Sequence, residues 1–143
     1  MQPRFGKFVL AVCSAAAAWM VGCAGPTGPK FQPAVSDPQK AVLYVFRDSG
    51  GGLDRSAIEI SINQQSAGQL RPGQYLVRSL PPGEYFVRAA LKSNMVRALT
   101  LAGGDVAYLR VTTEPFDGKK PLLNFPEYDV ARQMITNTTR VGE

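Results

Sequence analysis

The chain has 143 residues, of which 45% are hydrophobic and 19% charged, and its formal net charge is +5. This balance is typical of one globular domain and excludes a wholly disordered chain. The sequence contains no histidine, which excludes catalytic triads and metal sites that depend on imidazole. Both cysteines lie within the first 23 residues, so the N-terminus is the most informative part of the chain.

Residues 1–22 have the pattern of a secretory signal peptide. Two basic residues, Arg4 and Lys7, are followed by an uninterrupted run of apolar and small residues from 8 to 21. A transmembrane helix is the alternative, but a run of this length spans only about 21 Å as a helix, less than the roughly 30 Å hydrocarbon core of a bilayer. We therefore expect residues 1–22 to direct export and to be removed.

The signal pattern ends in Met20, Val21, Gly22 and Cys23, which resembles the lipobox of bacterial lipoproteins, with Met where Leu is commoner. The resemblance implies acylation of the Cys23 sulfur and cleavage before this residue. Two or three acyl chains anchor a domain durably, at about 0.8 kcal/mol per buried methylene. The alternative is a cysteine that merely ends a signal peptide. Ala24, and not Asp, comes next; by the same resemblance this favours an outer-membrane lipoprotein that faces the periplasm.

Such processing would change the chemistry of the mature chain. Loss of Arg4 and Lys7 from the 16 basic residues leaves 14 against 11 acidic residues, a net charge of +3. This excess is too small for a nucleic-acid binder. Cys13 would be discarded and Cys23 blocked, so the mature chain would have no free thiol, disulfide or soft metal ligand. We expect no metal and no cofactor.

Residues 23–39 are interpreted as the acylated cysteine and an extended tether. The segment from 24 to 39 contains four prolines and two glycines and has no apolar period. In a polyproline conformation it would reach about 50 Å. Packing of Phe31 and Val35 along the domain is the alternative. The domain itself is expected from 40 to 143.

From residue 40 onward, short apolar runs alternate with turns rich in Gly and Pro. Residues 42–46 form a β-branched and aromatic run typical of a central strand. In residues 58–62, three isoleucines alternate with polar residues, as in a strand with one buried face. Further strands are predicted at 75–80, 84–91, 95–101, 106–112 and 121–125. These seven strands predict a mainly β fold, an antiparallel β-sandwich.

A short C-terminal helix is predicted after Pro126, which is suited to a first helical turn. Four apolar residues fall on one face of this helix: Val130, Ala131, Met134 and Ile135. We expect this face to close the domain.

The order of the motifs resembles a family of bacterial lipoproteins catalogued only as a domain of unknown function, and its middle part resembles the PEGA type of small sandwich repeat. The shared features are the strand-like residues 43–47, a glycine-rich loop, residues 58–65, 74–77 and 80–85, and the turn at 102–104 before residues 108–111. The similarity covers residues 42–135. Asn63-Gln64-Gln65 stands where the family usually has Asp-Gly, so a looser hairpin is expected. The resemblance implies no catalytic residue, cofactor or known ligand.

The reactive side chains form no catalytic pattern. Gly50-Gly51-Gly52 is not followed by Gly-Lys-Ser/Thr, so a flexible loop is expected and not a phosphate site. The carboxylates have neither calcium-loop nor glycosidase spacing. An envelope hydrolase would require Asp54, Glu114 and Asp117 to gather in a cleft. A small-ligand carrier, another alternative, would require an enclosed apolar cavity.

The candidate binding surface is a basic and aromatic face. If Pro81-Pro82-Gly83 closes a hairpin, then Arg78, Phe86 and Arg88 share one face with Leu76. Such a face suits an anionic lipid or an acidic envelope protein. The alternative is a solvated face on which arginine stems cover the sheet. The sequence therefore predicts a non-catalytic binding or structural module that is held to the membrane by acyl chains.

Overall fold

The computed structural model describes residues 28–50 and 54–141. The predicted signal peptide and lipobox lie outside the described residues. The described part folds into strands and one short helix in this order: β1 (Ala41–Arg47), β2 (Ile58–Ile62), β3 (Gln65–Leu70), β4 (Gln74–Leu80), β5 (Gly83–Ala90), β6 (Asn94–Leu101), β7 (Val106–Thr113), β8 (Pro121–Asn124), α1 (Tyr128–Ile135) and β9 (Thr139–Arg140).

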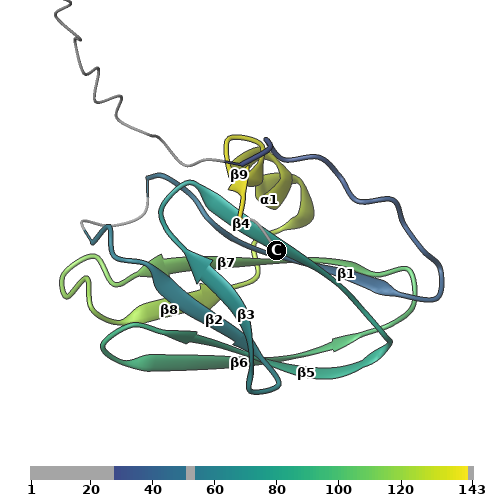
Figure 1. Cartoon of the computed structure of the whole chain (residues 1–143), viewed down its shortest axis with the longest axis horizontal. Helices are drawn as coiled ribbons and strands as arrows, with labels where there is room; N and C mark the ends of the chain where they lie inside the picture. Colours follow the sequence, from purple (N-terminus) through teal and green to yellow (C-terminus); the bar gives the residue numbers. More distant parts are fainter. Residues whose placement is uncertain (1–27, 51–53, 142–143) are drawn as a thin grey trace, which may run out of the picture.

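The strands form two sheets that pack face to face (Figure 1). The five-stranded sheet has the order β8-β7-β1-β4-β9, and the four-stranded sheet has the order β3-β2-β5-β6. The β-sandwich prediction is confirmed. The sandwich is mixed, however, because β1 pairs with β7, and β4 with β9, in parallel. Two strands, β3 and β9, add to the seven that the sequence predicts.

The position of β1 explains its continuous apolar sequence. All seven of its residues are buried, since it lies in the middle of the five-stranded sheet. Leu43 and Val45 face the core between the two sheets. Tyr44 and Phe46 face the other side and belong to a second buried cluster. A strand covered on both faces reads as an apolar run without alternation.

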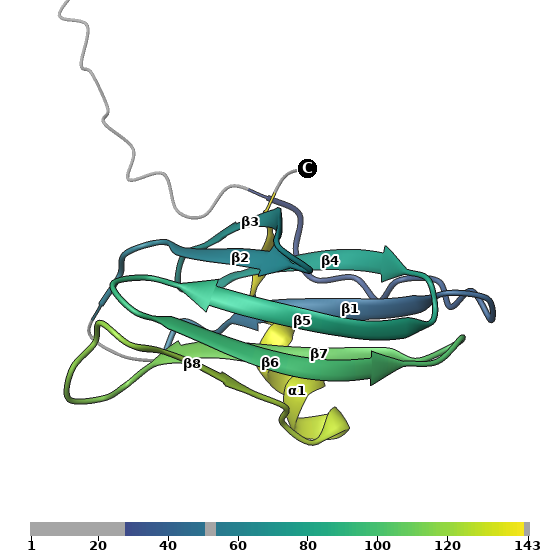
Figure 2. The same ribbon diagram turned by 90° about the horizontal axis from the view of Figure 1, so that it is seen from below.

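Helix α1 covers the outer face of the five-stranded sheet, behind β1 and β7 in Figure 2. Ala131 and Ile135 are fully buried there, and Met134 packs against the same cluster. Val130 is exposed, so three of the four predicted apolar positions face the domain. The C-terminal helix prediction is confirmed, with its first residue at Tyr128.

The connection between β4 and β5 is not a hairpin. These strands lie in different sheets, and only Pro81 and Pro82 separate them. A two-residue hairpin loop requires positive φ angles, whereas proline fixes φ near −65°. The chain therefore crosses from one sheet to the other at this point.

A tight hairpin joins β2 and β3. Its two loop residues, Asn63 and Gln64, have φ angles of 47° and 69°, as in a type I′ turn. The Asn63 side chain also accepts the amide of Phe86 at 2.9 Å. The hairpin is thus closed tightly, in spite of the missing glycine.

Candidate functional site

The predicted lipidation site, Cys23, and the preceding Met20, Val21 and Gly22 lie outside the described residues. The described chain begins at Gly28, five residues after Cys23. The path of the chain from Gly28 into the domain therefore determines how the domain would be connected to Cys23.

Residues 28–34, here called the N-terminal segment, lie against the edge of the five-stranded sheet. The amide of Arg140 donates to the carbonyl of Pro29 at 2.8 Å, and the amide of Phe31 donates to the carbonyl of Thr138 at 3.2 Å. An antiparallel bridge lies between these two hydrogen bonds. The segment therefore runs along β9 and covers an edge that would otherwise expose unpaired backbone.

Aromatic side chains of the five-stranded sheet pack against the N-terminal segment. The ring of Phe31 meets Tyr44 and Tyr75 edge to face, with centroids 5.4 and 5.6 Å apart. Tyr44 also stacks on Tyr108 at 5.0 Å, and its hydroxyl accepts the amide of Ala34. Burial raises the pKa of Tyr44, and it raises the pKa of Tyr108 to about 12. These tyrosines form the floor on which the segment docks.

The structure thus differs from the expectation of a free tether up to residue 39. Phe31 packs on the domain, whereas Val35 is 92% exposed. The difference arises because Phe31 finds a place on the tyrosines, which a count of prolines and glycines does not reveal. The alternative interpretation, in which Phe31 and Val35 pack along the domain, holds for Phe31 only.

The predicted basic and aromatic face does not form. Arg78 lies at the sandwich edge, where its guanidinium donates to the carbonyls of Val77, at 2.8 Å, and Ala67. Phe86 and Arg88 are exposed on the other sheet, and Phe86 is 50% exposed. The prediction was wrong because it assumed a hairpin at the two prolines, where the chain changes sheets.

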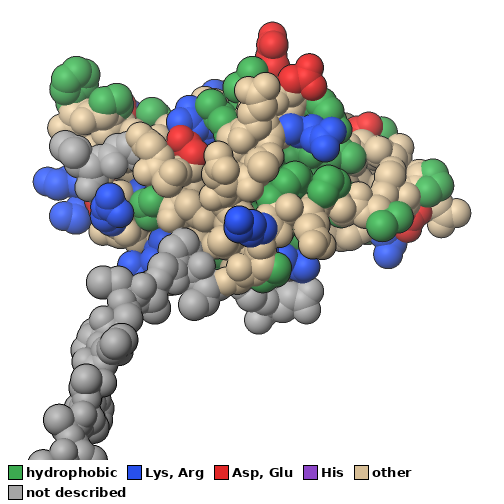
Figure 3. Space-filling model, turned by 90° about the horizontal axis from the view of Figure 1, so that it is seen from above, with side chains coloured by type: hydrophobic (Ala, Val, Ile, Leu, Met, Phe, Trp, Pro, Cys, Tyr) green, Lys and Arg blue, Asp and Glu red, His purple; other side chains and the backbone are tan. Residues whose placement is uncertain are grey.

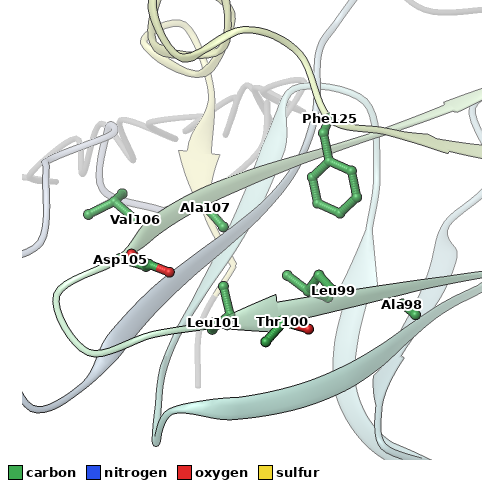
Figure 4. Close-up of a pocket in the computed structure, with 8 residues that line it drawn as sticks. All are labelled: Ala98, Leu99, Thr100, Leu101, Asp105, Val106, Ala107 and Phe125. Atoms are coloured by element: carbon green, nitrogen blue, oxygen red, sulfur yellow. The ribbon is translucent and has the colours of Figure 1, made fainter.

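An open pocket of about 410 Å³ lies between β6 and β7, where β8 has ended. In Figure 4 the ring of Phe125 extends into the space above Leu99. Six of its eight lining residues are apolar and one is a carboxylate: Ala98, Leu99, Thr100, Leu101, Asp105, Val106, Ala107 and Phe125. Asp105 is already engaged, because it accepts the amide of Ala102 at 2.7 Å. The pocket is open to solvent and is not the enclosed cavity expected of a carrier.

No pattern in the sequence predicts the buried arginine at the end of β1. Arg47 is fully buried, and its guanidinium donates to the backbone carbonyls of Ser56, at 2.6 Å, and of Asp54. The next residue, Asp48, forms a two-bond ion pair with Arg110, at 2.8 and 3.0 Å. Both arginines look like ordinary strand residues in the sequence, since only the three-dimensional fold gives them partners.

Two of the three acids that a hydrolase would need, Asp54 and Glu114, are engaged by other groups. Glu114 pairs with Lys120 at 3.4 Å, and Asp54 accepts the amide of Ser56 at 2.7 Å. Over residues 28–50 and 54–141, no three His, Cys, Asp or Glu side chains are grouped so that they could hold a metal ion. In the same part of the chain, no helix is long and apolar enough to cross a membrane.

Comparison with protein-family models gave no match for this chain, and a search of curated proteins found no similar sequence. The resemblance to the lipoprotein family of unknown function therefore stays a prediction. The candidate site consists of the predicted lipidation residue Cys23, which lies outside the described residues, and the docked N-terminal segment.

Proposed function

We propose that this protein is a lipid-anchored lipoprotein of the bacterial cell envelope, whose β-sandwich serves as a non-catalytic binding or structural module. The observation that carries the proposal is the sequence Met20-Val21-Gly22-Cys23 after a short apolar run and two basic residues. The docked N-terminal segment supports it, because it joins the proposed anchor to the sheet edge by backbone hydrogen bonds. Ala24 favours the outer membrane, with the domain in the periplasm.

The proposed lack of catalysis is supported by the way the domain uses its charged groups. Asp48 and Glu114 are held in ion pairs with Arg110 and Lys120. Arg47 is used to bind backbone carbonyls inside the domain. These side chains have structural partners and stand apart from the open pocket. A hydrolase is the least favoured alternative.

Acylation is tested by growing cells with an alkyne analogue of palmitate and expressing the full chain. The wild-type protein should incorporate the label and partition into the detergent phase of a cloud-point extraction. The change Cys23→Ser should abolish both, since the thioether cannot form. Cys13→Ser is the matched control and should leave labelling intact. Labelling that survives Cys23→Ser contradicts the proposal.

A small-ligand carrier is the second candidate function. The pocket beside Phe125 supports it by its size alone, since a volume of this size falls in the range of small-molecule sites but the pocket is not enclosed. A neutral naphthylamine dye is a suitable probe, because six of the eight lining residues are apolar. The change Phe125→Ala should weaken its binding several-fold, whereas Phe116→Ala, which removes a fully exposed ring, should have no effect. Equal dye binding by both variants excludes this pocket.

A further inference from the structure

The short chain between the proposed anchor and the domain limits how far the domain can lie from the membrane. Gly28 comes five positions after Cys23, and a fully extended chain over this stretch spans at most about 18 Å. A tether that is free up to residue 39 would reach about 50 Å. Docking of the N-terminal segment therefore brings the β9 edge close to the lipid surface.

Basic residues gather around the place where the described chain begins. Lys30 pairs with β9 through its backbone, and Arg140 lies within β9. Arg71 lies in the turn before β4, and this turn is joined to β9 by a hydrogen bond from the amide of Thr139 to the carbonyl of Gly73, at 2.9 Å. Figure 3 shows Lys and Arg side chains in blue close to where the described chain begins.

Among the residues that the structure describes at this edge, the charge is one-sided. Residues 28–31, 71–75 and 138–141 contain these three basic residues and no Asp or Glu. Lys30 and Arg71 are exposed, so they can approach a charged surface. Arg140 is half-buried and is already engaged by another group.

We infer that the β9 edge is the membrane-facing surface of the domain and that it rests on anionic lipid headgroups through Lys30 and Arg71; this inference depends on the acylation of Cys23 proposed above. Anionic lipid attracts each nearby Lys or Arg enough to change a population by about fivefold. The attraction fades over a Debye length, about 8 Å at physiological salt. The tether is short enough for the β9 edge to come within a Debye length of the headgroups, but it does not hold the edge there. The basic residues therefore decide whether this edge faces the membrane.

The opposite edge of the sheet would then face away from the membrane. β8 lies at the other end of the strand order from β9, and four strand spacings correspond to about 19 Å. The pocket beside Phe125 lies toward this distal edge, next to β6 and β7. Any partner of the pocket would thus approach from the periplasmic side.

The orientation is tested with the acylated full-length protein in vesicles of phosphatidylcholine, with or without phosphatidylglycerol. A donor dye is attached to one introduced cysteine, at Gln32→Cys near the β9 edge or at Asn124→Cys in β8. Both positions are exposed, and energy transfer to a headgroup-labelled lipid reports their height. We expect phosphatidylglycerol to increase transfer from position 32 and to decrease it from position 124.

Charge variants show whether the basic residues cause this orientation. Lys30→Gln with Arg71→Gln should lower the ratio of docked to undocked domain by roughly 20-fold and remove the effect of phosphatidylglycerol. Lys92→Gln with Lys119→Gln is the control, because it removes the same charge from exposed sites elsewhere and should preserve the effect. The inference is overturned if energy transfer with phosphatidylglycerol is equal at positions 32 and 124, or if both charge variants lose the effect of phosphatidylglycerol to the same extent.

Failure of the anchor is distinguishable from failure of the orientation. If Cys23 incorporates no palmitate analogue, the proposed function fails first. If Cys23 is acylated and phosphatidylglycerol has no effect, the anchor stands and the lipid-facing edge is wrong.

Discussion

Gly28 lies so close to the main chain of Arg140 that a Cβ atom on residue 28 would come within 1.9 Å of the Arg140 carbonyl oxygen. The neighbour is backbone, which cannot move aside as a flexible side chain can. Only glycine fits between the incoming chain and β9. This contact therefore helps to set where the domain begins and how short the tether to Cys23 is.

The change Gly28→Ala should release the start of the N-terminal segment from β9. The amide of Arg140, which now donates to Pro29, should then exchange its hydrogen at least about tenfold faster, as in a locally opened edge. Gly50→Ala is the control, because the nearest atom to its added Cβ lies at 3.8 Å. Unchanged exchange at Arg140 in the Gly28 variant would contradict the docked arrangement.

Phe31 should contribute measurably to stability. It is half-buried against Tyr44 and Tyr75, so Phe31→Ala should lower the free energy of unfolding by about 1–3 kcal/mol, less than for a fully buried ring. Urea denaturation of the unacylated Cys23→Ser chain, followed by circular dichroism, measures this loss. The neighbouring exposed change Gln32→Ala should stay within about 0.5 kcal/mol. Equal stability of the two variants would mean that residue 31 is not docked in solution.

The Asp48–Arg110 ion pair should make stability depend on pH in the acid range. Burial opposes the charged carboxylate of Asp48, but the hydrogen bonds and charge of Arg110 outweigh it and hold the pKa of Asp48 below its usual value. A lowered folded-state pKa stabilises the fold above the unfolded-state pKa of about 3.9, and this stability is lost as pH falls through the folded-state value.

Asp48→Asn should therefore be less stable than the wild type at pH 6, and the gap should shrink as pH falls below about 4. Urea denaturation over this range measures the gap. Asp37→Asn, at an exposed position outside the sandwich core, is the control. A difference in stability between Asp48→Asn and the wild type that stays constant with pH would show that ionisation of Asp48 does not contribute to stability.

The hairpin between β2 and β3 offers a stabilising change. Gln64 has a φ of 69°, a conformation that costs an ordinary L-residue about 1–2 kcal/mol and glycine almost nothing. Gln64→Gly should raise the free energy of unfolding by about 0.5–1 kcal/mol. Gln69→Gly, within β3, should lower it by a similar amount, because glycine weakens a strand interior. A loss of stability in both variants would contradict the type I′ turn.

The parts of the fold that the sequence predicts are those with strong local patterns. The apolar run of β1 and the alternating isoleucines of β2 identify both strands. β3 was missed because QSAGQL has no apolar alternation and contains Gly68. Its pairing depends on the turn before it and on β2 alongside it, and neither is visible within the segment.

The surface residues were harder to place, because a face depends on which sheet a strand joins. Leu76 and Arg78 do share one side of β4, as their spacing requires, but Leu76 lies in the core between the sheets. The crossover at Pro81 and Pro82 then puts Phe86 in the other sheet. Alternation in the sequence shows which residues share one side of a strand. What that side packs against depends on the tertiary structure.

Arg47 shows how tertiary structure gives an ordinary residue a special role. Its guanidinium is fully buried and binds the carbonyls of Asp54, Ser56 and Leu70. It thereby joins the end of β1 to the chain before β2 and to the end of β3. Burial lowers the pKa of Arg47, while the charges of Asp54 and Asp48 act in the opposite direction.

The change Arg47→Met should destabilise the domain even though it replaces a buried charge with an apolar chain. The change removes the cost of burying a charge, but the backbone carbonyls that the guanidinium binds remain in place. It leaves the carbonyls of Asp54, Ser56 and Leu70 without their donors, and each unsatisfied group costs about 1–3 kcal/mol unless water reaches it. Since two of these carbonyls lie in a partly exposed loop, we expect a loss of about 2–4 kcal/mol in urea denaturation.

Arg47→Lys keeps the charge without the planar guanidinium and should lose less stability than Arg47→Met. Arg55→Met, at an exposed position beside the same loop, should be nearly neutral, and an Arg47→Met protein as stable as that control would show that the guanidinium does not hold the loop.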